Sequence, residues 1–97
     1  WHWDDTWGWD FPMTAMTATR LQLPEKAIEA LLMPIRTNTY LLNGHNFQDA
    51  RLRLYLPGNG GFLTALALMT EGFDGSTPLM GIPKNWNVRY EGLVKMP

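Results

Sequence analysis

The chain has 97 residues, of which 45% are hydrophobic, and this fits one small globular domain without room for a second. Its formal net charge is -1 and its lysines and arginines form no cluster, so we predict neither nucleic acid nor a membrane as a partner. The chain has no cysteine, which excludes disulfides and thiolate chemistry but leaves the compartment open.

The first eleven residues, WHWDDTWGWDF, hold four of the five tryptophans together with three aspartates. Trp1, Trp3, Trp7 and Trp9 fall at alternate positions, so in an extended segment they would share one face. Contiguous exposed aromatic residues are typical of an interface or a ligand site. Two interpretations stay open: the indoles fill a core or contact a partner domain, or they stack against a sugar or another ligand.

Two proline signals predict a helical hairpin in the next part of the chain. Pro12, with Asp10 close enough to cap the first turn, predicts a helix over residues 12–22. Pro24 begins a second predicted helix over residues 24–35, which has acidic and basic side chains on one face. Because the connection between them is very short, the two helices are expected to lie antiparallel.

A third helix is predicted over residues 60–71, and it differs from the other two in having no polar face. No charged residue occurs from Phe62 to Met69, so this helix is expected to be enclosed on every side. Residues 58–61 form a glycine-rich lead-in, and Gly72 has the position of a left-handed C-terminal stop.

The segments between the helices predict little β-structure. Asn43-Gly44 indicates a turn, and residues 51–56 and 86–90 each alternate as a short strand would. The predicted fold is mainly α: a helical hairpin plus a third buried helix, with one or two short strands. The long loop over residues 37–61 is of the kind that is usually functional or disordered.

The number of times the chain reverses direction predicts how the three helices are oriented relative to one another. If the second helix runs antiparallel to the first, a third helix in the same layer runs parallel to the first, and the N-terminal ends of helices one and three lie together. Aromatic faces with carboxylate, amide and guanidinium groups suit the recognition of a pyranose. The candidate site at this end comprises the substrate-binding candidates Trp7, Trp9, Asp10, Arg51 and Asn59 and the catalytic candidates His45 and Asp49.

Four segments carry a resemblance to a known family: WGWDFPMTAMTATRLQLPEKAIEALL, NGHNF, PGNGGFLTALALMTEGFDG and PKNWNVRYEGL. In this order they resemble the C-terminal part of the six-hairpin, (α/α)6-toroid glycoside hydrolases, in particular the fucosidase-like and maltose-phosphorylase-like groups. The resemblance implies that residues 1–97 are a single unit within a larger catalytic domain. It also implies a carbohydrate substrate and a glycine-asparagine entry into the last inner helix, matched here by Gly58, Asn59 and Gly61.

The chain departs from that family at the residues that would perform the chemistry. The fucosidase-like entry has a functional aspartate where this chain has Pro57, and the general-acid glutamate of such enzymes lies further upstream. Asp49 is either a displaced carboxylate or a turn residue pairing with Arg51 or Arg53. His45 is either an acid or ligand, or an ordinary loop histidine. The histidine and carboxylate spacing indicates no metal site, and no cofactor is predicted.

Two functions of different classes follow from these observations. The first is a piece of a glycoside hydrolase that contributes part of the sugar pocket, is inactive alone and self-associates through uncovered apolar faces. Its full-length parent could be secreted or periplasmic. The second is a small helical module that binds a protein or a glycan through its N-terminal tryptophan cluster. If the parent reading frame encodes several hundred helical residues upstream of this segment, the glycoside hydrolase interpretation is correct.

Overall fold

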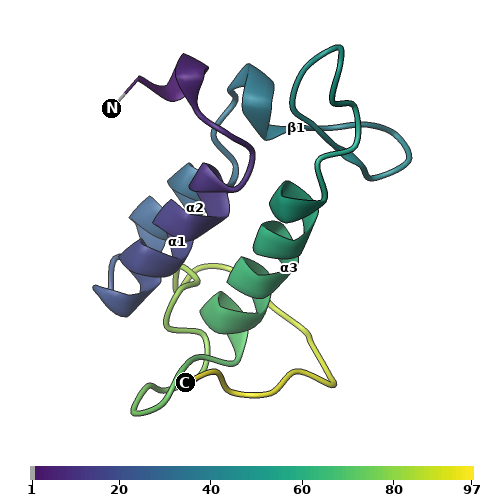
Figure 1. The fold of residues 1–97 in the computed structure, drawn as a ribbon. Helices are drawn as coiled ribbons and strands as arrows, with labels where there is room; N and C mark the ends of the chain where they lie inside the picture. Colours follow the sequence, from purple (N-terminus) through teal and green to yellow (C-terminus); the bar gives the residue numbers. More distant parts are fainter. Residues whose placement is uncertain (1) are drawn as a thin grey trace.

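The computed structural model describes residues 2–97, and Trp1 lies outside the described residues. The described chain contains three α-helices and one two-stranded sheet (Figure 1), which confirms the predicted mainly helical fold. Within residues 2–97, none of the helices combines the length and the hydropathy of a membrane span. The elements in chain order are η1 (Trp3–Asp5), α1 (Asp10–Arg20), α2 (Pro24–Leu31), η2 (Arg36–Asn38), β1 (Thr39–Tyr40), β2 (Asn46–Phe47) and α3 (Leu56–Thr70).

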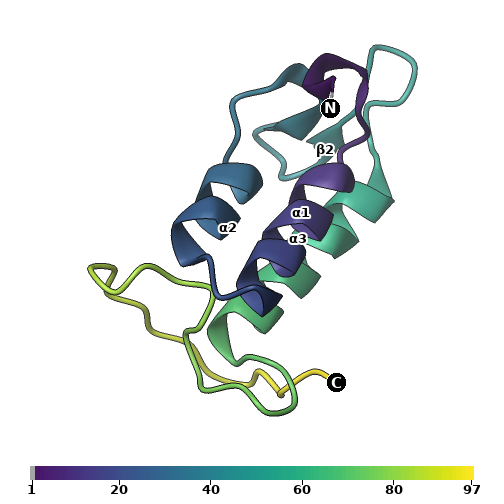
Figure 2. The same cartoon turned by 90° about the vertical axis from the view of Figure 1, so that its left-hand side faces the viewer.

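The helix α1 packs against both other helices, antiparallel to α2 and parallel to α3 (Figures 1 and 2). The predicted parallel arrangement of the first and third helices is therefore confirmed. Small side chains at the contacts allow the helix axes to approach closely. The buried alanines are Ala15 and Ala18 on α1, Ala27 and Ala30 on α2, and Ala65 on α3.

The prediction for the start of α3 is wrong, because the helix begins at Leu56 and includes the glycines that were expected to precede it. Pro57 suits the first turn, where its missing N–H has no intrahelical partner to lose. Two of the glycines lie where another segment approaches the helix. A Cβ atom on Gly61 would lie 2.9 Å from Cγ of Pro12, and one on Gly58 would overlap the side chain of Asn46. These glycines serve close packing rather than a turn.

Other helix ends also differ from their predicted bounds, by up to four residues. The helix α1 begins at Asp10, two residues before Pro12, and α2 ends at Leu31 rather than at Ile35. At the end of α3, Gly72 adopts a φ of 94° and stops the helix as predicted.

Only one face of α3 is enclosed, which corrects the expectation of a helix buried on every side. Leu68 and Met69 are buried against the core, whereas Leu63 on the opposite face is 67% exposed. The reason is that α1 covers one side of α3 and, within residues 2–97, no helix covers the other. A segment of 97 residues with three helices leaves this apolar face open to solvent.

The sheet forms at different residues from those predicted. Thr39 pairs with Phe47 and Tyr40 with Asn46 in an antiparallel hairpin, whose loop contains the predicted Asn43-Gly44 turn. Residues 51–56 are not a strand. The amide of Leu52 donates to the carbonyl of Asp49 instead, a local turn that uses the groups a ladder would need.

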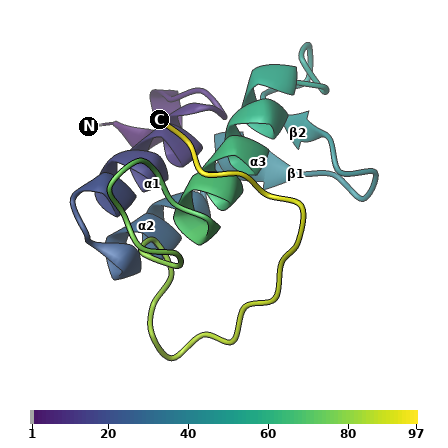
Figure 3. The ribbon, with the colours of Figure 1, turned by 90° about the horizontal axis from the view of Figure 1, so that it is seen from below.

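Residues 86–90 are also not a strand. After α3 the chain passes beneath α1 and α2 and returns along α3 in a wide arc (Figure 3). Val88 packs against the core from this arc, and the described residues offer no strand edge beside it. The alternation in the sequence has no counterpart in burial, because Trp86 and Tyr90 are exposed and only Val88 of the three alternating residues is partly buried.

The turn between α1 and α2 is a Schellman motif with an unusual residue at its left-handed position. The amide of Leu23 donates to the carbonyl of Ala18, that of Gln22 donates to Thr19, and Gln22 has a φ of 60°. We expect Gln22→Gly to raise the free energy of unfolding by about 0.5 kcal/mol, because the relief of left-handed strain exceeds the added freedom of the unfolded chain. Urea denaturation followed by circular dichroism measures this change. A loss of stability would contradict the assignment.

Candidate functional site

The starts of α1 and α3 lie side by side at one end of the molecule (Figure 2). They meet closely at Gly61, where a Cβ atom would lie 2.9 Å from Cγ of Pro12 and 4.0 Å from Cα of Trp9. The N-terminal segment and the loop before α3 both cover this end. All of the predicted site residues belong to these segments or to the first turns of the two helices.

A buried polar junction joins the N-terminal segment to the long loop beneath this end. Gln48 bridges them, because its Oε1 accepts the amide of Gly8 at 2.8 Å and its Nε2 donates to the carbonyl of Thr6 at 3.1 Å. Arg36 donates to the carbonyl of Gln48 at 2.9 Å. We define the buried polar junction as Thr6, Thr37, Asn46 and Gln48, all of which are buried.

Asn46 is the centre of this junction. Its Nδ2 donates to the carbonyls of Thr37 at 3.3 Å and Thr39 at 3.1 Å. Its side chain packs directly against Gly8 and Gly58, where a Cβ atom would overlap it. One side chain thereby fixes the relative positions of the N-terminal segment, the hairpin and the first turn of α3.

Above the junction, aromatic rings and one carboxylate reach the surface. The rings of Trp7 and Tyr55 lie 5.5 Å apart between centroids at an angle of 36°, and Asp10 accepts the amide of Trp7 through Oδ2 at 2.7 Å. Trp7 is 48% exposed and Trp9 is 44% exposed. We call Trp7, Trp9, Asp10 and Tyr55 the aromatic surface.

Asp10 also acts on Tyr55 electrostatically. Burial raises the pKa of the Tyr55 phenol above its ordinary value, and the negative charge of Asp10 raises that pKa further. The phenol is therefore neutral around pH 7 and can donate its proton in a hydrogen bond. Asp10 uses one carboxylate oxygen, Oδ2, to accept the Trp7 amide.

Among the described tryptophans, Trp3, Trp7 and Trp9 do not share one face of an extended segment, so the prediction from their alternation is wrong for these three. Residues Trp3–Asp5 form η1, and Trp3 turns inward to stack on Phe11, with centroids 5.4 Å apart and ring planes at 25°. Trp7 and Trp9 remain at the surface. The core interpretation thus applies to Trp3, and the ligand-facing interpretation remains for Trp7 and Trp9.

Asn59 lies at the same end as Trp9, but its side chain serves the fold. Its Oδ1 accepts the amide of Asn46 at 2.9 Å, and its Nδ2 donates to the carbonyl of Gly44 at 2.8 Å. His45 is half-buried in the hairpin loop, where its backbone amide donates to Oδ1 of Asn43 at 3.1 Å.

Asp49 adopts the role of a turn residue. Its Oδ1 accepts the backbone amides of Arg51 at 2.8 Å and Leu52 at 2.9 Å, which is an Asx-turn. Arg51 is exposed beside it. This geometry occupies Asp49 with backbone hydrogen bonds, and the interaction with Arg51 is with the backbone rather than the guanidinium group.

Sequence reasoning missed Tyr55, Asn46 and Gln48. Tyr55 was assigned to a strand, whereas it is the residue that caps the start of α3. No sequence pattern predicts a role for the side-chain amides of Asn46 and Gln48, because only the folded chain shows that they are buried. The sequence feature that comes closest to predicting the buried Asn46 is the glycines that pack against it, since a glycine within an element indicates a close approach by another segment.

The site offers binding groups rather than an identifiable acid–base pair. Within residues 2–97, no group of three or more histidine, aspartate or glutamate side chains is arranged to hold a metal ion. Clefts of about 580, 450 and 420 Å³ lie elsewhere on the molecule, and none of these three is lined by a residue of the aromatic surface. Comparison of the chain with protein-family models, with curated proteins and with solved structures gives no significant match.

Proposed function

We propose that this chain contributes one wall of the sugar-binding pocket in a glycoside hydrolase of the six-hairpin type. The observation that carries the proposal is the aromatic surface, at the end of the molecule where α1 and α3 both begin. The general acid would come from residues outside this chain, because Asp49 is engaged in a turn. The 97-residue chain is therefore expected to be inactive by itself.

The chemistry of the aromatic surface supports a carbohydrate ligand. The C–H face of a pyranose is apolar and stacks on an exposed indole, which Trp7 and Trp9 both provide. Asp10 can accept hydrogen bonds from sugar hydroxyls, and the neutral phenol of Tyr55 can donate one. Below these groups, the buried polar junction holds the segments in place, which reduces the entropy lost on binding.

The apolar grooves beside α3 support a larger domain. One groove of about 450 Å³ lies between the end of α2 and α3 and includes Leu32 and Phe62. Another of about 420 Å³ runs along α3 past Leu63. In a toroid of helical hairpins, the neighbouring hairpins would cover such faces.

The isolated chain is accordingly expected to self-associate. Light scattering should give an apparent mass that rises with protein concentration, because each Å² of apolar surface buried contributes about 25 cal/mol. Leu63→Glu should shift the chain toward the monomer, since it places a charge on the open face of α3. Thr64→Glu, at the exposed neighbouring position, is the matched control and should change the mass less. A clean monomer at high concentration would count against a truncated toroid.

The role of Trp9 is testable in the full-length protein. Trp9→Ala should lower kcat/KM about tenfold, equivalent to about 1.4 kcal/mol, because it removes a stacking face from the pocket. Its free energy of unfolding should change far less, since the indole is 44% exposed. Val94→Ala, at an exposed position remote from this end, is the control. Equal losses of activity and stability would instead make Trp9 a residue of the fold.

A second candidate is a self-standing helical module that binds a glycan or a protein through the same tryptophans. The observation that favours it is the chain's own core, in which Ala15, Ala65 and Met69 are completely buried. A monomeric isolated chain with sugar affinity equal to that of any longer parent would decide for this candidate.

A further inference from the structure

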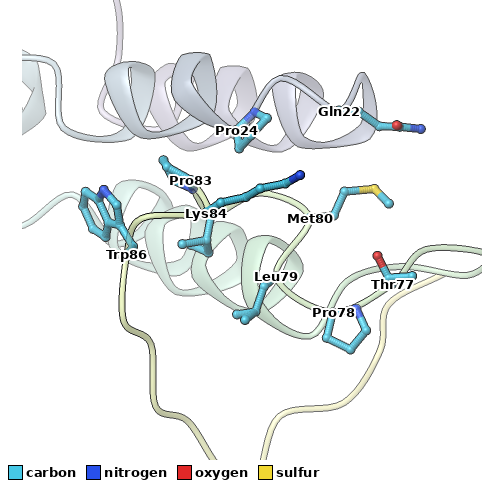
Figure 4. Close-up of a pocket in the computed structure, with 10 residues that line it drawn as sticks. Gln22, Pro24, Thr77, Pro78, Leu79, Met80, Pro83, Lys84 and Trp86 are labelled. Atoms are coloured by element: carbon cyan, nitrogen blue, oxygen red, sulfur yellow. The ribbon is translucent and has the colours of Figure 1, made fainter.

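A recess lies at the other end of the helices, away from the aromatic surface (Figure 4). Its volume is about 580 Å³, within the range of about 300–1,000 Å³ that is typical of small-molecule sites. Gln22 and Pro24 line it from the connection between α1 and α2. Residues of the segment 77–86 line the other side. We call this recess the far cleft.

The backbone around the far cleft is held firmly. The amide of Leu79 donates to the carbonyl of Thr70 at 2.7 Å, and that of Gly81 donates to Met69 at 3.1 Å. Leu79 itself has a left-handed φ of 63°, a conformation that a leucine adopts only when its surroundings impose it. Three prolines stiffen the lining further: Pro24, Pro78 and Pro83.

The far cleft combines one cation with an exposed indole. Among the described residues that line it, Lys84 is the only charged one, and no partner in residues 2–97 pairs with its ammonium group. The ammonium end lies on the side away from Trp86, toward Met80 and Gln22 (Figure 4). Trp86 is 47% exposed. A ligand that satisfies both groups has a flat apolar face at one end and an anion at the other.

We propose that the far cleft binds an acidic sugar, such as a uronate residue within a short oligosaccharide. The C–H face of one ring would stack on Trp86, and the carboxylate of the neighbouring uronate residue would pair with Lys84. The hydroxyl of Thr77, which also lines the cleft, would supply a hydrogen bond for one of the ring hydroxyls. This site shares no residue with the aromatic surface, so the proposal for the far cleft does not depend on the proposed function.

Indole resonances in a ¹H–¹⁵N NMR spectrum of the full chain provide the test. Trp86→Phe identifies the Trp86 signal by its loss. Adding digalacturonate should shift that signal progressively with millimolar affinity, whereas maltose, a neutral disaccharide, should leave it in place at the same concentration. The affinity for digalacturonate should fall as salt is raised, because the ammonium–carboxylate interaction is screened.

Two substitutions with a matched control assign the contacts. Lys84→Met should weaken digalacturonate binding about tenfold by removing the charge and keeping the apolar stem. Thr77→Val should also weaken it, though by less, because it removes one hydroxyl at an exposed position and keeps the shape of the side chain. Lys26→Met is the control, since Lys26 is exposed and pairs only with Glu29 at 3.6 Å.

Several outcomes would overturn the proposal. They are the absence of any shift at tens of millimolar digalacturonate, an equal response to maltose, and an unchanged affinity in Lys84→Met. A shift with phenylacetate but none with digalacturonate would also overturn it, because the cleft would then take an aromatic carboxylate rather than a sugar.

Discussion

Gly58→Ala is expected to destabilise the chain by about 3 kcal/mol, although alanine is ordinarily the better residue in a helix. The added Cβ would overlap the side chain of Asn46, which is buried and cannot move into solvent. Displacing it would also break its hydrogen bonds to the carbonyls of Thr37 and Thr39. Urea denaturation of the variant and the parent chain measures the difference.

Gly60→Ala is the matched control, two residues along the same helix. Nothing lies within 4 Å of a Cβ atom at Gly60, so the substitution adds helix propensity without a clash. It should stabilise the chain by about 0.5–1 kcal/mol. If both variants changed stability in the same direction, Asn46 would not be the fixed packing partner described above. Gly8→Ala should resemble Gly58→Ala, because Gly8 meets the same side chain from the other side.

Phe11→Ala is expected to cost about 3–5 kcal/mol, the largest loss among single core substitutions. The ring of Phe11 is fully buried near the start of α1 and stacks on Trp3 at 5.4 Å. Truncation would leave a cavity and remove the partner of that indole. Because domains of this size are stable by only about 5–15 kcal/mol, the variant should be partly unfolded at moderate temperature.

Thermal unfolding followed by circular dichroism checks this expectation. Leu42→Ala, which removes a large apolar side chain from a fully exposed loop position, is the control and should stay within about 0.5 kcal/mol of the parent. A cost for Phe11→Ala as small as that of the control would show that the start of α1 is not part of the core.

Local signals predicted the helices because their causes lie within a few residues. Pro24 starts α2, Gly72 ends α3 and Asn43-Gly44 lies in the hairpin loop, each through a backbone preference of the residue itself. The parallel arrangement of α1 and α3 followed from the short α1–α2 connection. The convergence of Trp9 and Asn59 at one end followed from that arrangement.

Loop turns and packing between distant segments decided the features that the sequence misassigned. The alternation over residues 51–56 did not become a strand, because a strand requires a partner edge and the chain closes a local turn there. The glycines at 58 and 61 look like a flexible lead-in, yet they lie inside α3 where other segments approach it.

By itself, then, the sequence determined the helical elements, their order and the end of the molecule at which the aromatic and polar residues gather, because propensities, caps and short connections act locally. Only the tertiary structure decided which of those residues are free to meet a ligand. Asn59 and Asp49 are engaged by backbone groups of the hairpin and its following turn, whereas Tyr55 joins Trp7 and Asp10 at the surface. The physical reason is that burial and hydrogen-bond partnership are properties of segments distant in sequence, which meet only when the chain folds.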